Sequence, residues 1–212
     1  MKLTFILPGY SRKPVGGHRI IYEYANRLSA RGHEICIVYP KKIKMLWDSY
    51  GLVKKLQINI MQTIRSVAKA DPEWQKLNSD ICRMFVPEPT AQYIPDADVV
   101  FSTIWALAEY MLDYPDSKGK QCYFFQHYET WSGPKEIVDA TWRMPFKKIV
   151  ISKWLKNIGE SLGATEMHYI PNGLDFSHFR LITSIENRPK RISMMFSDAE
   201  WKGGKEGLSA LL

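Results

Sequence analysis

The sequence predicts an α/β fold built on a Rossmann-like, doubly wound parallel sheet. Short β-rich runs alternate along the chain with segments of helical period, which is the pattern of strands joined by crossover helices. Most of the runs are apolar without strict alternation, as expected for strands covered on both faces. The 212 residues are 45% hydrophobic and 24% charged, an ordinary globular composition that excludes disordered, collagen-like and coiled-coil proteins.

Six runs are the expected strands, and two amphipathic segments are the clearest helices. The strands are expected at residues 3–7, 35–39, 81–86, 99–103, 121–126 and 148–151. In the first helix, over residues 17–31, Ile20, Tyr24 and Leu28 fall four apart, and Gly32 stands at the C-cap. The second helix, over residues 153–162, follows Ser152 and ends at Gly163. Its inward-facing side chains are expected to be Trp154, Leu155, Ile158 and Leu162.

The charge balance indicates an anionic partner. The chain has 29 Lys and Arg against 22 Asp and Glu, a net charge of +7. Nearly all of this excess lies in residues 41–70, where seven cations accompany a single acid, Asp48. The seven cations are Lys41, Lys42, Lys44, Lys54, Lys55, Arg65 and Lys69.

The same segment has an apolar stripe at helical spacing, formed by Val53, Leu56, Ile60, Ile64 and Val67. Two interpretations stay open. The helix either docks on the sheet with a solvated basic face, or it contacts anionic lipid or a lipid-linked acceptor. A nucleic acid is not expected, because no recognition helix or basic strand with interleaved aromatic residues is present.

Cysteine and histidine spacing predicts neither a disulfide nor a metal site. Cys36, Cys82 and Cys122 are far apart in the sequence and set in apolar runs, which is typical of small buried hydrophobes in a reducing compartment. The five histidines form no i, i+4 metal pair. Because the first seven residues lack a signal-peptide core, we expect a cytoplasmic location.

A glycine pair, Gly16 and Gly17, stands at the end of the loop after the first strand and directly before the first helix. At this place in a doubly wound sheet, glycines let a ligand approach the backbone, and the N–H groups of the helix start favour phosphate. The loop matches neither the dinucleotide fingerprint nor the P-loop. Plain loop geometry therefore stays an alternative to anion binding.

Two later stretches give this loop its context. Residues 126–131 read Gln-His-Tyr-Glu-Thr-Trp, and residues 170–175 read Ile-Pro-Asn-Gly-Leu-Asp. With the Gly-Gly loop, Arg-Gly-His at 31–33 and the strand end Ile-Ser at 151–152, the sequence resembles the N-terminal half of a family 4 glycosyltransferase. Such enzymes have the GT-B fold, retain configuration and use nucleotide-sugar donors. The resemblance covers nearly the whole chain. It is closest to branches acting on bacterial cell-surface polysaccharides, including rhamnosyltransferase-like members.

The resemblance implies a domain organisation. Residues 1–186 would form the N-terminal acceptor-side Rossmann-like domain with its linker. Residues 187–212 would begin the C-terminal nucleotide-sugar-binding domain, with a strand at 191–197 and a loop at 201–204. The chain is thus expected to be a piece of a two-domain enzyme, inactive alone.

The resemblance also assigns site residues. His127 would be catalytic, touching the donor sugar or the reacting centre; its alternative is a histidine satisfied at a strand end. The residues that would bind the donor diphosphate are Gly16, Gly17 and Lys202. Glu129 and Trp131 would meet the sugar or acceptor, or else anchor a surface loop. Asn172 and Gly173 would form a turn beside the donor cleft.

The implied activity is transfer of a sugar from a nucleotide diphosphate sugar to a polysaccharide or lipid-linked acceptor, without a cofactor or an obligatory metal. The protein would be peripheral on the inner face of the cell membrane, which it would touch through residues 41–70. One alternative is a non-catalytic half that binds acceptor or membrane for a separate donor-binding subunit. Another is a nucleotide-sugar epimerase of the GT-B fold.

Overall fold

The computed structural model describes residues 1–48, 51–58, 60, 72–194 and 202–211. The chain divides into two compact units, Met1–Asn172 and Gly173–Leu212, and each is described here by itself.

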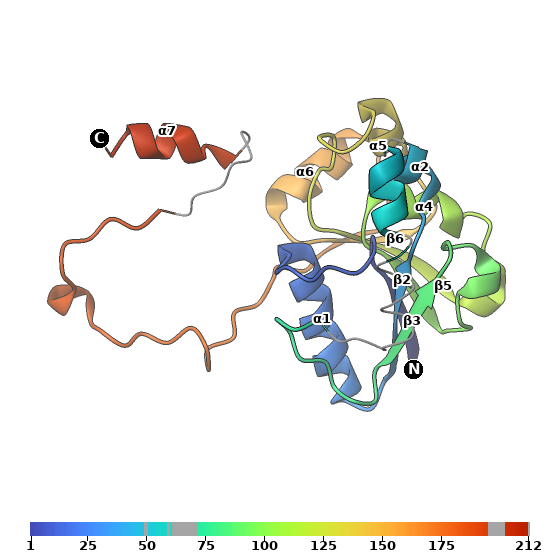
Figure 1. The fold of residues 1–212 in the computed structure, drawn as a ribbon, viewed down its shortest axis with the longest axis horizontal. Helices are drawn as coiled ribbons and strands as arrows, with labels where there is room; N and C mark the ends of the chain where they lie inside the picture. The colour runs from blue at the N-terminus through green and yellow to red at the C-terminus, as the bar shows by residue number, and fades with distance from the viewer. Residues whose placement is uncertain (49–50, 59, 61–71, 195–201, 212) are drawn as a thin grey trace. The chain divides into compact units, whose positions relative to one another are not determined.

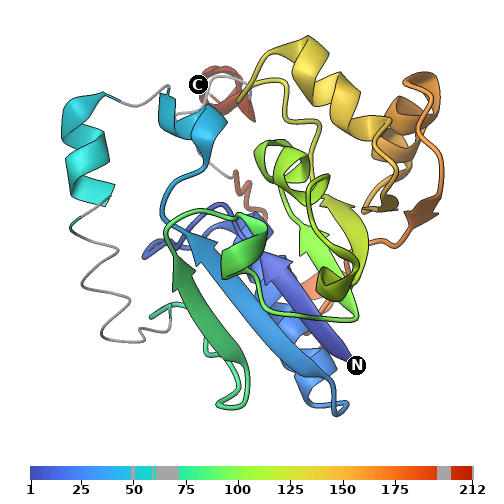
Figure 2. The same ribbon diagram turned by 90° about the vertical axis from the view of Figure 1, so that its right-hand side faces the viewer.

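The first unit is built on a seven-stranded, all-parallel sheet, which confirms the predicted Rossmann-like doubly wound α/β fold. The strand order is β3-β2-β1-β4-β5-β6-β7. Figure 2 shows β1 and β2, in blue, beside the green edge strand β3. The strands are β1 (Lys2–Ile6), β2 (Glu34–Pro40), β3 (Cys82–Val86), β4 (Val99–Ser102), β5 (Lys120–Phe125), β6 (Lys147–Val150) and β7 (Met167–Tyr169).

Helices cover both faces of the sheet (Figure 1). The helices of this unit are α1 (Gly16–Ser29), α2 (Lys44–Asp48), α4 (Trp105–Met111), α5 (Lys135–Trp142) and α6 (Lys153–Ser161). Crossover connections between parallel strands are right-handed. A helix therefore lies on the opposite face of the sheet when the next strand is added on the opposite side. Accordingly, α1, which leads from β1 to β2, packs on one face, and α4, α5 and α6 pack on the other.

Each face has its own apolar core. On the α1 side, Ile21, Tyr22 and Ala25 pack on side chains of β1 and β2. On the other side, Trp142 of α5 stacks on Phe125 of β5, with 3.8 Å between ring centroids. The strands are therefore buried from both sides, which explains their nearly continuous apolar sequences.

The predicted helix ends are confirmed. Ser152 caps α6 by accepting a hydrogen bond from the Leu155 N–H at 3.1 Å. Gly32 and Gly163 have positive φ after α1 and α6, the conformation that favours glycine at a helix end. The sequence analysis missed α4, α5 and β7. Each is short, and tertiary packing outweighs its weak local signal.

The second unit has little regular structure among its described residues. It contains a 3₁₀ turn, Ile185–Asn187, and the helix α7 (Gly204–Ser209). The strand expected at 191–197 is wrong for residues 191–194, which are irregular, and residues 195–197 lie outside the described structure. Within the described helices of the whole chain, none is both long and apolar enough to cross a membrane.

A buried lysine ties β6 to the loops around it. Lys148 is fully buried, and its Nζ donates hydrogen bonds to the carbonyl oxygens of Met144 (2.8 Å), Phe146 (2.8 Å) and Thr165 (3.2 Å). Burial lowers the pKa of Lys148, and the nearby Glu166 carboxylate opposes this shift. The three carbonyls replace the water that the ammonium group loses on burial.

We expect Lys148→Met to lower the free energy of unfolding by about 2–4 kcal/mol, because three buried carbonyl oxygens lose their donor. Urea unfolding followed by circular dichroism measures the change. Lys147→Met is the matched control, since Lys147 is the exposed neighbour on the same strand. A loss of less than about 0.5 kcal/mol for Lys148→Met would contradict this role.

Candidate functional site

The strand order reverses between β1 and β4, and the candidate site lies at the carboxyl ends of these strands and of β5. This is the position at which doubly wound folds bind ligands, because the loops after neighbouring strands turn to opposite faces. The Thr103 hydroxyl, after β4, donates a 2.7 Å hydrogen bond to the carbonyl oxygen of Ile6 in β1. The two central strands are thus joined at their carboxyl ends.

The loop after β1 is fixed by hydrogen bonds. His18, buried in the first turn of α1, forms a 2.8 Å hydrogen bond through Nε2 with the Gly9 carbonyl oxygen. Burial lowers the pKa of His18, and the bond to Gly9 opposes this shift. The Trp74 indole N–H donates to the Ser11 carbonyl oxygen at 3.1 Å. His18 therefore has a structural role, and the two bonds fix the path of the loop.

The start of α1 is open. The N-cap residue Val15 provides no side-chain hydrogen bond to the helix, and the first turn has no acidic residue. A Cβ atom built on Gly16 would meet nothing within 4 Å, and one on Gly17 would make only ordinary contacts of 3.5 Å or more with Gln126. Neither packing nor backbone conformation therefore requires glycine at these two positions. Their effect is to keep the N–H groups of the helix start approachable.

Gln126 joins this helix start to the loop after β5. Its side-chain amide donates a 3.1 Å hydrogen bond to the Gly17 carbonyl oxygen. Gln126 thereby links the predicted glycine pair to the loop after β5, in which the predicted His127 is the next residue. The sequence analysis missed Gln126, although a polar residue at the end of an apolar strand is a signal for this edge of the sheet.

His127 lies among aromatic rings. Its Nδ1 atom is 3.2 Å from the indole nitrogen of Trp131, which donates, and 3.0 Å from the Tyr128 carbonyl oxygen. The Trp131 and Trp154 rings contact the imidazole edge to face, with centroids 6.4 and 6.0 Å away. Trp131 is 61% exposed and Trp154 is 54% exposed. The inward packing predicted for Trp154 is therefore wrong.

The placement of Trp154 has a simple cause. It stands in the first turn of α6, two residues after the Ser152 cap, where α6 leaves the carboxyl end of β6. Leu155, the next residue, is the one buried in the core. Helical spacing alone could not separate these two neighbours. The position of the helix start at the ligand edge of the sheet is the signal that distinguishes them.

Glu129 has a different environment from that of its neighbour Trp131. The Oε2 atom accepts hydrogen bonds from the Trp105 backbone N–H at the start of α4 (2.9 Å) and from the Tyr123 hydroxyl (3.4 Å). Burial raises the pKa of Glu129 to about 7, although both hydrogen bonds act in the opposite direction. Glu129 thus holds the loop on α4, which is the predicted loop-anchor alternative, and its carboxyl group titrates near neutrality.

Further contacts hold the loop on Trp105. The Trp105 indole N–H donates to the Ser132 hydroxyl at 2.9 Å, and that hydroxyl donates to the Glu129 carbonyl oxygen at 3.0 Å. A Cβ atom on Gly133 would lie 2.3 Å from the Trp105 ring, so only glycine fits there. The loop that displays His127 and Trp131 is consequently rigid.

The remaining predicted site residues lie elsewhere in the chain. Asn172 follows the edge strand β7, two strands away from β5 in the sheet order, and Gly173 begins the second unit. Both are exposed. Lys202 belongs to the second unit and precedes α7. In the segment 41–70, Arg65, Lys69, Ile64 and Val67 lie outside the described residues.

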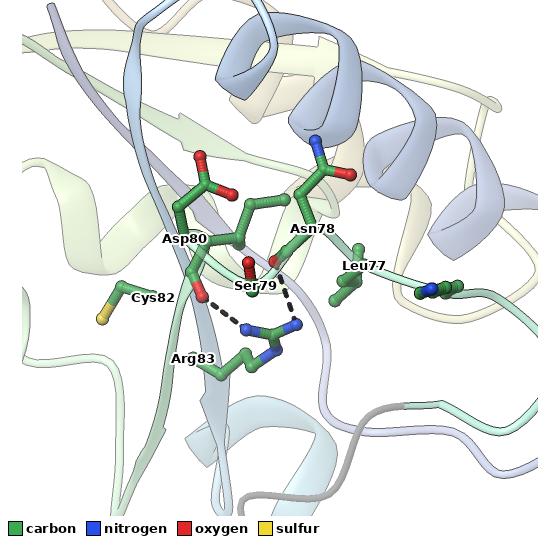
Figure 3. Close-up of a pocket in the computed structure, with 8 residues that line it drawn as sticks. Leu77, Asn78, Ser79, Asp80, Cys82 and Arg83 are labelled. Carbon is green, nitrogen blue, oxygen red and sulfur yellow. Dashed lines mark hydrogen bonds between the residues drawn. The ribbon is translucent and has the colours of Figure 1, made fainter.

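A separate cavity lies away from this site. It has a volume of about 830 Å³ and is lined by the segment from Lys76 to Arg83 (Figure 3). There the Arg83 guanidinium donates to the carbonyl oxygens of Ile81 (2.6 Å) and Asn78 (3.2 Å). The Asn78 backbone N–H donates a hydrogen bond to the Asn26 side chain of α1. The Ser29 hydroxyl of α1 donates one to the Asp80 carboxylate. These internal bonds identify the segment as a brace between α1 and β3.

Comparisons of the chain with protein-family models, with curated proteins and with solved structures found no match. Among the described residues, no three His, Cys, Asp or Glu side chains are grouped so as to hold a metal ion.

The raised pKa of Glu129 makes stability depend on pH in a defined direction. The folded chain binds this proton more tightly than the unfolded chain, where the pKa is near 4.5. The stabilisation is full below about pH 4.5 and is lost as the pH rises through about 7. Glu129→Gln keeps an oxygen acceptor for the Trp105 N–H, so we expect it to flatten this dependence.

Urea unfolding of wild type and Glu129→Gln at pH 5 and pH 8 measures this difference. Glu136→Gln, at an exposed position on α5, is the control and should keep the wild-type dependence. If wild type and Glu129→Gln lose equal free energies between the two pH values, Glu129 is not the titrating group.

Proposed function

We propose that this chain provides the acceptor-side domain of a retaining glycosyltransferase that uses a nucleotide diphosphate sugar. The observation that carries the proposal is the contact between Gln126 and Gly17, which joins the start of α1 to the loop that carries His127 and the exposed Trp131. An anion site and a saccharide-stacking surface at one edge of the sheet are the two features that such a reaction needs.

The anion site is the start of α1. The N–H groups of an uncapped helix start attract negative charge, and α1 has no side chain in its first turn that competes for them. In a nucleotide diphosphate sugar, the diphosphate is the group that would accept hydrogen bonds from these N–H groups. The diphosphate role of Lys202, which belongs to the second unit, stays a prediction from the resemblance.

The saccharide surface is formed by Trp131 and Trp154, which both contact His127. An exposed indole offers an apolar face for the C–H groups of a sugar ring, while its hydrogen-bonding edge can stay engaged. The Trp131 indole N–H is held by His127, which fixes the orientation of the ring. An acceptor sugar lying on these rings would be held close to the imidazole.

The two parts together fit the chemistry of retaining transfer. The departing diphosphate gains negative charge while the sugar gains oxocarbenium character, so pre-oriented N–H groups at the diphosphate stabilise the transition state. Holding acceptor and donor side by side supplies the remaining advantage through proximity. His127 is the proposed catalytic residue, in contact with the sugar at the reacting centre.

We expect His127→Ala to lower turnover by about 100-fold, because it removes a polar contact at the reacting centre. Release of nucleoside diphosphate by the full reading frame that contains this chain, in the presence of acceptor, measures the change. His33→Ala, directly before the amino end of β2, is the matched control. Both variants should unfold at the wild-type temperature. Unchanged turnover would leave His127 a structural residue. Interconversion of free donor without acceptor would favour the epimerase instead.

A second proposal concerns an anionic membrane. It rests on a helix that carries both lysines and exposed apolar side chains. Residues 52–58 are helical, and the apolar side chains of the predicted stripe are exposed, with Val53 at 72%, Leu56 at 60% and Ile60 at 52%. Docking of this stripe on the sheet, the first of the two sequence interpretations, is therefore wrong for these residues. Lys54 and Lys55 lie on the same helix. Apolar residues beside lysines are typical of helices that lie in a lipid interface.

We expect the double variant Lys54→Glu, Lys55→Glu to weaken binding to phosphatidylglycerol vesicles at least tenfold, since each basic residue contributes about 1 kcal/mol near an anionic surface. Vesicle sedimentation measures the binding. The control is Lys120→Glu, Lys147→Glu, which makes the same change in charge at exposed sites at the start of β5 and β6. Equal binding by wild type and both double variants would contradict membrane contact through this helix.

A further inference from the structure

Two cysteines that the sequence analysis treated as unrelated are neighbours in the sheet. Cys82 lies 46 positions after Cys36, yet the two are register partners at the start of β3 and β2. Paired residues on parallel strands place their side chains on the same face of the sheet. A side-chain interaction with Cys82 is the main cause of the raised pKa of the Cys36 thiol. The expectation that all three cysteines are buried holds for Cys36 and Cys122 and is wrong for Cys82, which is exposed.

The spacing of the strands suits a covalent link. Neighbouring strands lie about 4.8 Å apart, which falls within the roughly 4.4–6.8 Å between Cα atoms that a disulfide spans. The pair also lies on the edge of the sheet, because β3 is the outermost strand. A bond between these sulfur atoms would require little movement of the backbone.

The two sulfur atoms differ in access. Cys36 is buried, at 8% exposure, and Cys82 is exposed. Cys82 lines the 830 Å³ cavity, and both cysteines line a second pocket of about 220 Å³ with Lys2, Thr4 and Asp96. Figure 3 shows the Cys82 side chain pointing away from the Arg83 guanidinium. A small reagent in solvent can therefore reach Cys82 first and Cys36 only afterwards.

We propose that Cys36 and Cys82 form a reversible, oxidation-sensitive dithiol that closes to a disulfide in the presence of a small disulfide such as oxidised glutathione. This site lies near the amino ends of β2 and β3, whereas His127 follows the carboxyl end of β5. It is independent of the proposed glycosyl transfer. It would tie the edge strand β3 to β2.

The chemistry balances in two exchange steps. The Cys82 thiolate attacks one sulfur atom of oxidised glutathione, which releases one glutathione thiolate and leaves a mixed disulfide on Cys82. The Cys36 thiol then loses its proton and attacks the Cys82 sulfur, which expels the second glutathione thiolate. The protein loses two protons and two electrons, and glutathione disulfide takes up the two electrons. The interaction with Cys82 and, after it, burial raise the pKa of Cys36, so its thiol stays protonated until this second step.

Peptide mapping of the folded chain after incubation with glutathione disulfide tests the proposal. We expect a disulfide-linked pair of tryptic peptides, one with Cys36 and one with Cys82, while Cys122 remains open to alkylation after denaturation. Dithiothreitol should restore three reactive thiols. The link should raise the melting temperature by about 5–10 °C, because it closes a long loop in the unfolded chain.

Two variants separate the alternatives. Cys122→Ser should give the same linked peptides, which shows that the third thiol takes no part. Cys36→Ser should stop at the mixed disulfide on Cys82. If the wild type also stops at the mixed disulfide, or links Cys82 only between two copies of the chain, the proposal is wrong.

Discussion

The reversal of strand order between β1 and β4 is the constraint on which the candidate site depends. Crossover helices leave the sheet toward opposite faces on the two sides of this point, so loops and helix starts gather at the carboxyl ends of the strands. The strands themselves are held by packing, for example by the Phe5 and Phe101 rings, which stack across β1 and β4 at 4.7 Å. The sheet thus fixes where a ligand can be held before any single side chain is considered.

Hydrogen bonds to the backbone turn this edge into a rigid surface. His18 holds the loop after β1, Gln126 joins the loop after β5 to α1, and Glu129 holds that same loop on α4. These side chains are occupied in positioning their neighbours. The groups left facing solvent are the helix start at Gly16 and the rings of Trp131 and Trp154. Such preorganisation is what transfer between two bound substrates requires.

The fold could be predicted well from the sequence, because strands buried on both faces have nearly continuous apolar sequences. Helix ends could also be predicted, because Ser152 and Gly163 are local signals. The sequence predicted the site less completely. The contact of Gln126 with Gly17 and the pairing of Cys36 with Cys82 join residues far apart in the chain, so no local pattern contains them. Trp154 was assigned to the core because spacing cannot decide which of two adjacent apolar residues faces the sheet.

The most direct test of the central claim is a nitrogen-15 NMR titration of this chain with millimolar UDP-glucose and with dTDP-rhamnose. The account predicts that at least one donor moves the backbone signals of Gly16, Gly17 and His127, together with the indole signals of Trp131 and Trp154. Signals that stay in place for both donors, or that shift only in the cavity lined by Lys76 to Arg83, would contradict a donor and saccharide site at the reversal of strand order.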